Sequence, residues 1–304
     1  MQKRLLNLTV IIFTGLVSVA QFSAFAADET QSFTVELSNP GKPATLHIDS
    51  HFLKITVAAE DRKDMVFEIS PRDYDSEYGH VITRTNDKNR AYNFVYNDRH
   101  DIDVGLETQR QRDTSGMTRI DSNPGFVVEE LNNMVRFDSE FMRQGYQVKV
   151  KVPVNTSLKL ENVNGGPLTV SGVNGTHELS NTNGPVYASD ISGSVVAETT
   201  NGTIEVTMSS VTKDTPMAFS TTNGSVDVTF PASYRADAVI DPGRGSTYTD
   251  FEFVTNNTAH VERLEGEKGK RIEVKREIRG KINGGGPTLR METFNGNIYI
   301  RKGK

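Results

Sequence analysis

The sequence predicts an all-β protein whose main body is a β-solenoid built from short strands with Asn-Gly turns. Three observations lead to this prediction. Asn-Gly recurs six times with similar flanks, apolar residues alternate with polar ones on both sides of it, and the clearest copies start only 18 to 22 residues apart, at Asn183, Asn201 and Asn223. A unit of that length holds two short strands and two corners, and it buries its apolar face only by stacking on its neighbours.

Residues 1–26 are predicted to be a secretory signal peptide. Lys3 and Arg4 precede an apolar run, and Ala24-Phe25-Ala26 forms a small-x-small cleavage site. No later segment approaches the ~18 uninterrupted apolar residues of a spanning helix, so we expect no integral membrane segment after cleavage. The expected location is the periplasm or the cell surface.

The net charge and the absence of cysteine argue against several kinds of partner and site. Removal of Lys3 and Arg4 leaves 32 Lys and Arg against 39 Asp and Glu, a net charge of −7, which argues against nucleic acid as a partner. The chain contains no Cys. Disulfides, thiolate metal sites and a Cys nucleophile are therefore excluded.

The repeat is defined by positions around each Asn. Apolar residues occupy eleven of the twelve positions that lie six and four residues before it, and apolar residues return three and five residues after it in the last four copies. This period of two indicates strands with one buried face. A small residue two positions before each Asn is expected to point inward. The predicted turn residues are Asn164, Asn174, Asn183, Asn201, Asn223 and Asn295, and Asn-Gly favours turns because both residues tolerate positive φ.

A copy without Asn lies near the start of the mature chain. Leu46 and Ile48 stand where the leading apolar pair belongs, Ser50 is the small inward residue, and Ile55 and Val57 are the trailing pair. The predicted organisation is therefore a signal peptide (1–26), N-terminal solenoid strands (27–70), an aromatic-rich insertion (71–146) and the Asn-Gly solenoid (147–304).

An antiparallel β-sandwich is the alternative fold, because Asn-Gly also joins hairpin strands. The solenoid is favoured because the other corner of the best copy, Ser192-Gly193, differs in chemistry from the Asn-Gly corner. A coil with two unlike corners predicts this difference.

The repeat, with "VKVKVPVNTSLKLENVNG" (148–165) before it and "GRGSTYTDFEF" (243–253) after it, resembles the DUF4097 family of adhesin-like proteins. The resemblance covers residues 44–70 and 147–301. It implies an exported or surface-attached bacterial β-solenoid of binding or structural type, and it brings no catalytic residues.

The insertion at 71–146 holds nine of the 21 aromatic residues of the mature chain. Tyr92, Phe94 and Tyr96 alternate in "AYNFVYN" as on a strand, and we predict them as a stacking platform for glycan or peptide. The alternative is that these aromatics only form the insertion's own small core or cover the solenoid. Apolar residues at helical spacing from Val127 to Val135 predict a short amphipathic helix after Pro124.

Motifs for chemistry are weak. Asp73, Asp75 and Glu77 leave open a loose calcium site or a plain acidic loop, since Tyr78 stands where an EF-hand needs Gly. His177 is expected inside the core, and no zinc or nucleophile motif accompanies the other histidines. We therefore predict no catalytic residue, metal or cofactor.

The predicted function is an exported, non-enzymatic, adhesin-like binding or structural protein of the bacterial envelope, with an envelope glycan or a surface protein as partner. The first alternative is a carbohydrate-active enzyme, a polysaccharide lyase or hydrolase, with outward acids such as Glu178, Glu198 and Glu205. The second alternative is an envelope-stress accessory that binds a partner protein through an edge strand.

Overall fold

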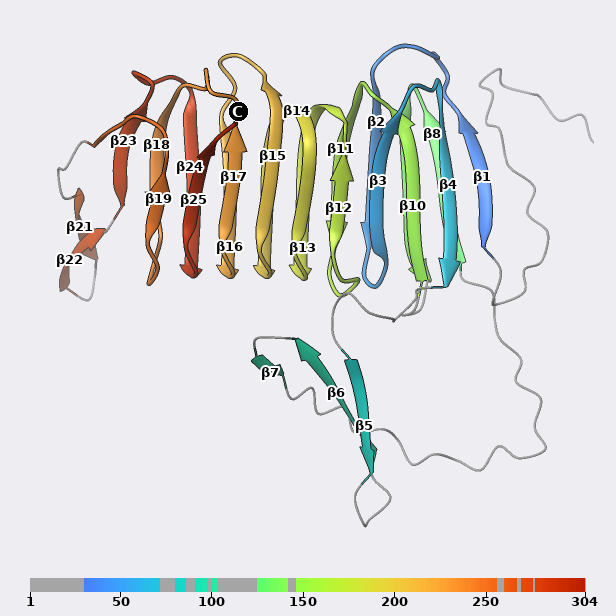
Figure 1. Cartoon of the computed structure of the whole chain (residues 1–304), viewed down its shortest axis with the longest axis horizontal. Coiled ribbons are helices and arrows are strands. Elements are labelled where there is room, and N and C mark those ends of the chain that lie inside the picture. Colours follow the sequence, from blue (N-terminus) through green and yellow to red (C-terminus); the bar gives the residue numbers. More distant parts are fainter. Residues whose placement is uncertain are drawn as a thin grey trace, which may run out of the picture.

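The computed structural model describes residues 30–71, 80–85, 91–97, 100–102, 125–141, 146–255, 260–266, 269–275 and 277–303. Every regular element within these residues is a β-strand, and the strands of the main body follow one another along the longest axis of the molecule (Figure 1). The strands of successive coils pair in parallel. The predicted solenoid is therefore confirmed, and the antiparallel sandwich is wrong. The predicted signal peptide lies outside the described residues.

The main body consists of two layers that face each other across the core. The leading layer contains, in spatial order, β8 (Gly125–Leu131), β9 (Met134–Phe141), β2 (Ala44–Ser50), β11 (Thr156–Asn162), β13 (Asn174–Asn183), the second half of β14 (Val186–Asn201), β16 (Met217–Asn223), β24 (Thr288–Asn295), β18 (Ala236–Asp241), β23 (Ile278–Ile282) and β20 (Phe253–Thr255). The trailing layer contains β1 (Gln31–Glu36), β4 (Asp64–Pro71), β10 (Tyr146–Pro153), β3 (Lys54–Glu60), β12 (Leu168–Ser171), the first half of β14, β15 (Ile204–Val211), β17 (Val226–Phe230), β25 (Ile298–Lys302) and β19 (Thr247–Thr249).

Two smaller sheets complete the description. A three-stranded antiparallel sheet contains β5 (His80–Thr85), β6 (Ala91–Asn97) and β7 (His100–Ile102), and β21 (His260–Gly266) pairs with β22 (Gly269–Lys275) as a hairpin.

The core lies between the two layers because alternate residues of each strand point inward. In the leading layer, Leu158 of β11 is paired with Leu46 of β2 on one side and with His177 of β13 on the other, and all three are fully buried. Burial of a Leu, Ile or Val side chain contributes about 1.5–3 kcal/mol. The strands therefore keep one register from coil to coil, since a slip by one residue would expose every apolar side chain.

One rung from the early part of the chain and one from its late part each lie between rungs formed by other parts of the chain. A leading strand and the trailing strand that follows it form one rung. The rung β2–β3 lies between β9–β10 and β11–β12, although it precedes both in the sequence. In the same way, β24–β25 lies between β16–β17 and β18–β19. Each terminal part of the chain is thus held on both sides by ladders of hydrogen bonds.

Four phenylalanines close the N-terminal end of the core. Phe33 of β1, Phe67 of β4, Phe126 of β8 and Phe137 of β9 stack around a ring, with neighbouring centroids 5.1 to 5.6 Å apart. Terminal units of a solenoid need such covers because one face of their core has no neighbour. Two of the insertion's aromatics, Phe126 and Phe137, therefore serve packing.

The helix predicted between Val127 and Val135 is wrong. This segment forms the hairpin of β8 and β9, and its turn residues Asn132 and Asn133 have φ of 54° and 62°. Two consecutive residues of positive φ are the geometry of a tight hairpin turn. Because β9 pairs with β2, the solenoid begins before the boundary predicted at residue 146.

The first corner joins each leading strand to its trailing strand and carries a ladder of asparagines. Each side-chain amide donates to the side-chain oxygen of the asparagine in the preceding rung over 2.7 to 2.8 Å, in the order Asn164, Asn183, Asn201, Asn223 and Asn295. A second ladder lies just inside it, in which one side chain per rung donates to a backbone carbonyl of the preceding rung over 2.8 to 3.1 Å; its members are Asn162, Asn181, Thr199, Thr221 and Thr293. These two ladders fix the spacing of the rungs at this corner.

The sixth predicted turn residue, Asn174, lies at the other corner. It begins β13, is paired with Ser192, and donates from its amide to Asn155 over 2.9 Å. We call the corner from a trailing strand to the next leading strand the second corner. The assignment of Asn174 to the Asn-Gly corner is wrong because spacing alone does not distinguish the two ends of a rung.

Glycine at the first corner is required by the contact between rungs. None of the five ladder asparagines has a positive φ, so the turn geometry that Asn-Gly suggested does not apply to them. Instead, a Cβ on Gly202 would lie 2.2 Å from the carbonyl oxygen of Gly184 in the preceding rung. Positive φ does occur at the remaining Asn-Gly, where Asn283 and Gly284 have φ of 48° and 87°.

Candidate binding pocket at the second corner

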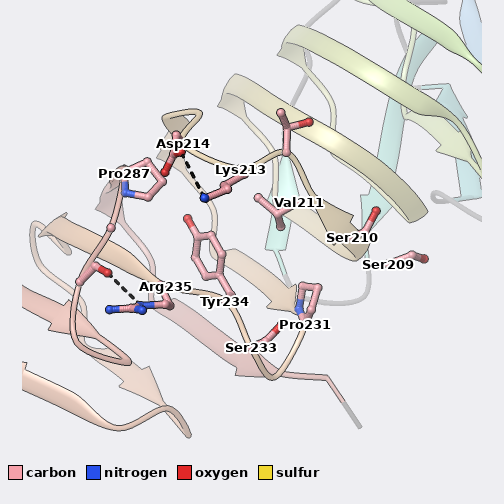
Figure 2. A pocket seen from close by; sticks show the side chains of 13 residues that line it. Ser209, Ser210, Val211, Lys213, Asp214, Pro231, Ser233, Tyr234, Arg235 and Pro287 are labelled. Atoms are coloured by element: carbon pink, nitrogen blue, oxygen red, sulfur yellow. Dashed lines mark hydrogen bonds and ion pairs between the residues drawn. The ribbon is translucent and has the colours of Figure 1, made fainter.

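A pocket of about 470 Å³ opens at the second corner near the C-terminal end of the stack (Figure 2). Three segments line it: residues 209–214 at the end of β15, residues 231–235 between β17 and β18, and residues 285–287 before β24. The loops that carry these segments, 212–216, 231–235 and 283–287, are each five residues long, whereas the loops 154–155 and 172–173 earlier in the stack have two residues. Clefts of this size suit small ligands.

Tyr234 lies at the centre of the pocket. Its ring stacks on Phe230, with centroids 4.1 Å apart and planes 12° apart, and only 6% of the residue is exposed. Its hydroxyl is buried and has no hydrogen-bond partner among the described residues, and Figure 2 shows it directed toward Lys213 and Asp214. Burial raises the pKa of Tyr234. The side chain is therefore a neutral phenol that can still donate and accept a hydrogen bond.

Asn283 holds the loop that carries Tyr234. Its amide donates to the carbonyl oxygens of Ala232 and Tyr234 over 3.2 and 2.7 Å, and its left-handed φ of 48° is a strained conformation for a non-glycine residue. Arg235 ties the same loop to the third segment, since its Nε donates to the carbonyl oxygen of Gly285 over 3.2 Å. The pocket is thus shaped before any ligand enters.

The rim of the pocket is polar and carries both signs of charge. Lys213 and Arg235 supply two cations, and Asp214 supplies one carboxylate. The Lys213 ammonium lies 4.0 Å from the Asp214 carboxylate, and both side chains are more than three-quarters exposed, so this ion pair contributes little stability. Hydroxyl groups come from Ser209, Ser210, Thr212 and Ser233. The arrangement can accept a small hydroxylated ligand that bears a negative group.

Tyr92, Phe94 and Tyr96, the predicted stacking platform, lie on β6, the middle strand of the three-stranded sheet. The structure describes the backbone of this strand but not its side chains. The platform therefore stays a prediction. The acids Asp73, Asp75 and Glu77 lie outside the described residues.

Sequence reasoning missed the pocket because none of its residues follows the repeat. The only available indication was a loss of period two between Pro231 and Gly280, combined with Gly285, Gly286 and Pro287 directly before a strand. Such a break predicts a loop, but it does not predict that three loops meet.

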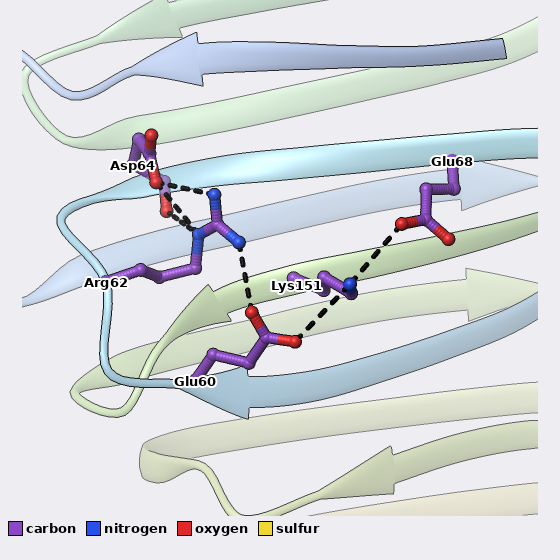
Figure 3. Close-up of polar contacts among 5 residues, drawn as sticks. All are labelled: Glu60, Arg62, Asp64, Glu68 and Lys151. Atoms are coloured by element: carbon purple, nitrogen blue, oxygen red, sulfur yellow. Dashed lines mark hydrogen bonds and ion pairs between the residues drawn. The ribbon is translucent and has the colours of Figure 1, made fainter.

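Charged residues elsewhere form ion pairs that join strands (Figure 3). Arg62 contacts Glu60 at 3.2 Å and Asp64 at 2.7 Å, and Lys151 lies 3.5 Å from Glu60 and 3.4 Å from Glu68. The carboxylate of Glu60, followed by that of Glu68, raises the pKa of Lys151. This cluster connects β3, β4 and β10. Over the part of the chain that the structure describes, no three His, Asp or Glu side chains are close enough to hold a metal ion.

One family model and one solved structure are similar to this chain. Residues 141–283 match the family model described as Toastrack DUF4097, so the resemblance to this family is confirmed over that range. The chain is also similar to a crystal structure of a candidate cell adhesion protein from Clostridium sporogenes, with 9% identity, a TM-score of 0.40, and coverage of 90% of this chain and 99% of that chain. A search of curated proteins gives no match.

The described residues include no helix that is long and apolar enough to cross a membrane.

Proposed function

We propose that the protein is an exported, non-enzymatic binding protein of the bacterial envelope, in the periplasm or at the cell surface. The solenoid serves as a rigid support, and the pocket around Tyr234 binds a small polar part of an envelope glycan or a surface protein. The single observation that carries this proposal is the buried hydroxyl of Tyr234, which has no partner in a pocket that is already formed. An unsatisfied buried polar group costs about 1–3 kcal/mol, and a ligand or water that bonds to it removes this cost.

Export is supported by the N-terminal sequence. Lys3 and Arg4, the apolar run after them and the Ala24-Phe25-Ala26 site have the order of a cleaved signal peptide. The test is to express the full chain in a bacterium, separate cytoplasm from envelope and sequence the N-terminus of the product. We expect a chain that begins at Ala27 in the envelope fraction. A chain that keeps residues 1–26 in the cytoplasm would contradict the proposal.

A binding role without catalysis is supported by the chemistry of the pocket. Tyr234 is held as a neutral phenol by burial, and the carboxylate of Asp214 is the only one that lines the pocket. Glycoside hydrolysis ordinarily needs two carboxylates on opposite sides of the bond that breaks. The test is to incubate the purified protein with envelope polysaccharides and measure both retention of the polymer and release of new reducing ends. We expect retention without release, and release would favour the carbohydrate-active enzyme instead.

A further inference from the structure

The pocket around Tyr234 has the chemistry of a site for an acidic sugar. We propose that it binds a uronic acid residue, free or within an envelope polysaccharide, and this inference rests on the proposed binding function. The carboxylate of the sugar is held by Arg235 and Lys213, and a ring hydroxyl takes the hydroxyl of Tyr234 as its partner. The serine and threonine hydroxyls of the rim and the carboxylate of Asp214 contact the other ring hydroxyls.

Charge favours a ligand with one negative group. Two cations and one carboxylate line the pocket, which leaves a formal charge of +1. Arg235 is fixed by the bond from its Nε to Gly285, and its terminal nitrogens donate to no other residue of the described chain. A guanidinium fixed at one edge presents the rest of its planar donors for a carboxylate in two parallel hydrogen bonds.

Size and polarity favour a sugar over a simple anion. A volume of about 470 Å³ far exceeds that of a phosphate or sulfate ion and suits one or two sugar rings. The lining combines apolar groups, from Val211, two prolines and the ring of Tyr234, with four hydroxyl side chains and the charged groups of the rim, and a sugar presents both apolar C–H faces and hydroxyl groups. A ligand that is rich in hydroxyl groups matches such a lining.

The buried hydroxyl of Tyr234 adds specificity. A site that contains a buried, unpaired donor rejects a ligand that lacks the matching group, because the donor then stays unsatisfied. Tyr234 cannot turn its hydroxyl to solvent, because its ring stacks on Phe230 and Asn283 holds its backbone. A ligand with a carboxylate but no hydroxyl group would contact only the rim and would leave the Tyr234 hydroxyl without a partner.

The test is titration calorimetry of the purified protein with glucuronic acid, an oligoglucuronate, glucose and inorganic phosphate. We expect both uronates to bind, and glucose and phosphate to bind at least tenfold more weakly. The oligomer distinguishes a polymer site from a site for the free sugar, since a polymer site binds it more tightly than the monomer. Equal affinity for phosphate and uronate would overturn the proposal, because the pocket would then recognise charge alone; equal affinity for glucose would overturn the role of Arg235 and Lys213.

Two variants test whether the uronate binds in the pocket around Tyr234. Tyr234→Phe keeps the stacked ring, and Arg235→Gln removes the cation; each is expected to weaken uronate binding at least tenfold. Lys159→Gln, on β11 in the outer surface of the leading layer, is the matched control and should bind as the parent does. Uronate binding that both pocket variants leave unchanged would overturn the proposal.

The proposed function and this inference fail differently. If no uronate binds but an envelope polysaccharide or surface protein binds in a manner lost in Tyr234→Phe, the binding function stands and the acidic-sugar inference is wrong. If envelope ligands bind and Tyr234→Phe leaves their affinity unchanged, the pocket is not the binding site, and both the proposed binding function of the pocket and the acidic-sugar inference are wrong. Thermal unfolding of each variant, measured in parallel, shows whether a loss of binding reflects a loss of folding.

Discussion

At the first corner, each Asn-Gly pair stacks on the pair of the preceding rung, whereas near the C-terminal end of the second corner three five-residue loops enclose a pocket. The first corner has two ladders of side-chain hydrogen bonds and no space for a Cβ at Gly202. The second corner between β15 and β24 has a buried hydroxyl without a partner at Tyr234. Between β15 and β24, the first corner therefore sets the spacing of the rungs and the second corner encloses a pocket. Earlier in the stack the second corner is also closely packed, since a Cβ on Gly193 would meet the carbonyl oxygen of Gly175.

The difference follows from where the sequence repeats. A ladder needs the same side chain at the same place in every rung, so each position of the first corner is constrained by two neighbours. A loop that contacts no identical loop has no such constraint. This comparison leads to four predictions about stability, for substitutions of Gly202, Thr221, His177 and Tyr234.

The largest expected effect is that of Gly202→Ala. The added Cβ would meet the carbonyl oxygen of Gly184 at 2.2 Å, and neither backbone can move without breaking the ladders. We expect a loss of about 3 kcal/mol in the free energy of unfolding, measured by urea denaturation.

The control for this prediction is Gly41→Ala. Nothing lies within 4 Å of a Cβ at Gly41, but its φ is 84°, so this variant measures the cost of a positive φ alone, about 1–2 kcal/mol. Gly202 has no positive φ, so its loss comes from the contact between rungs, and a loss smaller than that of Gly41→Ala would contradict the expected clash.

Thr221→Val tests the inner ladder. Thr221 is buried and its hydroxyl donates to the carbonyl oxygen of Gly202 over 2.8 Å. Valine has nearly the same shape but leaves that carbonyl without this partner, so we expect a loss of about 1–2 kcal/mol in urea denaturation. Thr212→Val, at an exposed position of the second corner, should change stability by less than about 0.5 kcal/mol. A larger loss for Thr212→Val than for Thr221→Val would reverse the comparison.

His177 connects the core with the second corner and makes stability depend on pH. It is fully buried, its Nε2 lies 3.1 Å from the carbonyl oxygen of Ser192, and its Nδ1 has no partner among the described residues. Burial lowers the pKa of His177 below its usual 6.5, and the bond to Ser192 only partly opposes this. The neutral ring with a proton on Nε2 is therefore the folded form.

Because the unfolded chain binds this proton more readily, the stability from His177 is complete above pH 6.5 and falls as the pH drops from 6.5 toward the lower pKa of the folded state. His177→Leu, which matches its neighbour Leu158, should flatten the dependence of the unfolding temperature on pH in that range. An unchanged slope in the variant would assign the pH dependence to other groups.

Among the substitutions of buried residues, the smallest expected effect on stability is that of Tyr234→Phe. The substitution removes a buried hydroxyl that has no partner and keeps the stack on Phe230, so the free energy of unfolding should rise or stay within about 1 kcal/mol of the parent. Thermal unfolding measures this. A loss above about 2 kcal/mol would mean that the hydroxyl has a structural role, and the argument for a binding role would then fail.

The stack could be predicted from the sequence because its signal is periodic. The alternation of apolar and polar residues placed Leu158 and Leu160 in the core. The same alternation identified the rung that contains Ser50, although this rung has no Asn at the turn position. The contact between rungs was not visible in this way: Asn-Gly suggested positive φ, which Gly184 and Gly224 adopt, whereas Gly202 is required to be glycine because Gly184 approaches it closely.

What the sequence did not predict depends on pairing over long distances. The segment from Val127 to Val135 has helical spacing, but the edge of the sheet at β2 pairs with it as a strand, which outweighs local preference. The threading of β24–β25 between rungs that come earlier in the chain follows no local pattern. The pocket is made by Tyr234, Lys213 and Gly285 from three separate loops, and single loops give no indication that they meet.

Hydrogen exchange of the backbone amides, measured along the native chain, tests the contrast between the corners most directly. The amides of Gly202 and Gly224 at the first corner donate to carbonyl oxygens of the next rung over 2.9 and 3.0 Å, and we expect them to exchange as slowly as the core strands. The amides of residues 213–215 and those of Ala232, Ser233 and Arg235, in the loops around the pocket, should exchange much faster. Equal exchange rates in the two places would contradict the claim that ladders hold the first corner while the second corner around the pocket is free to bind.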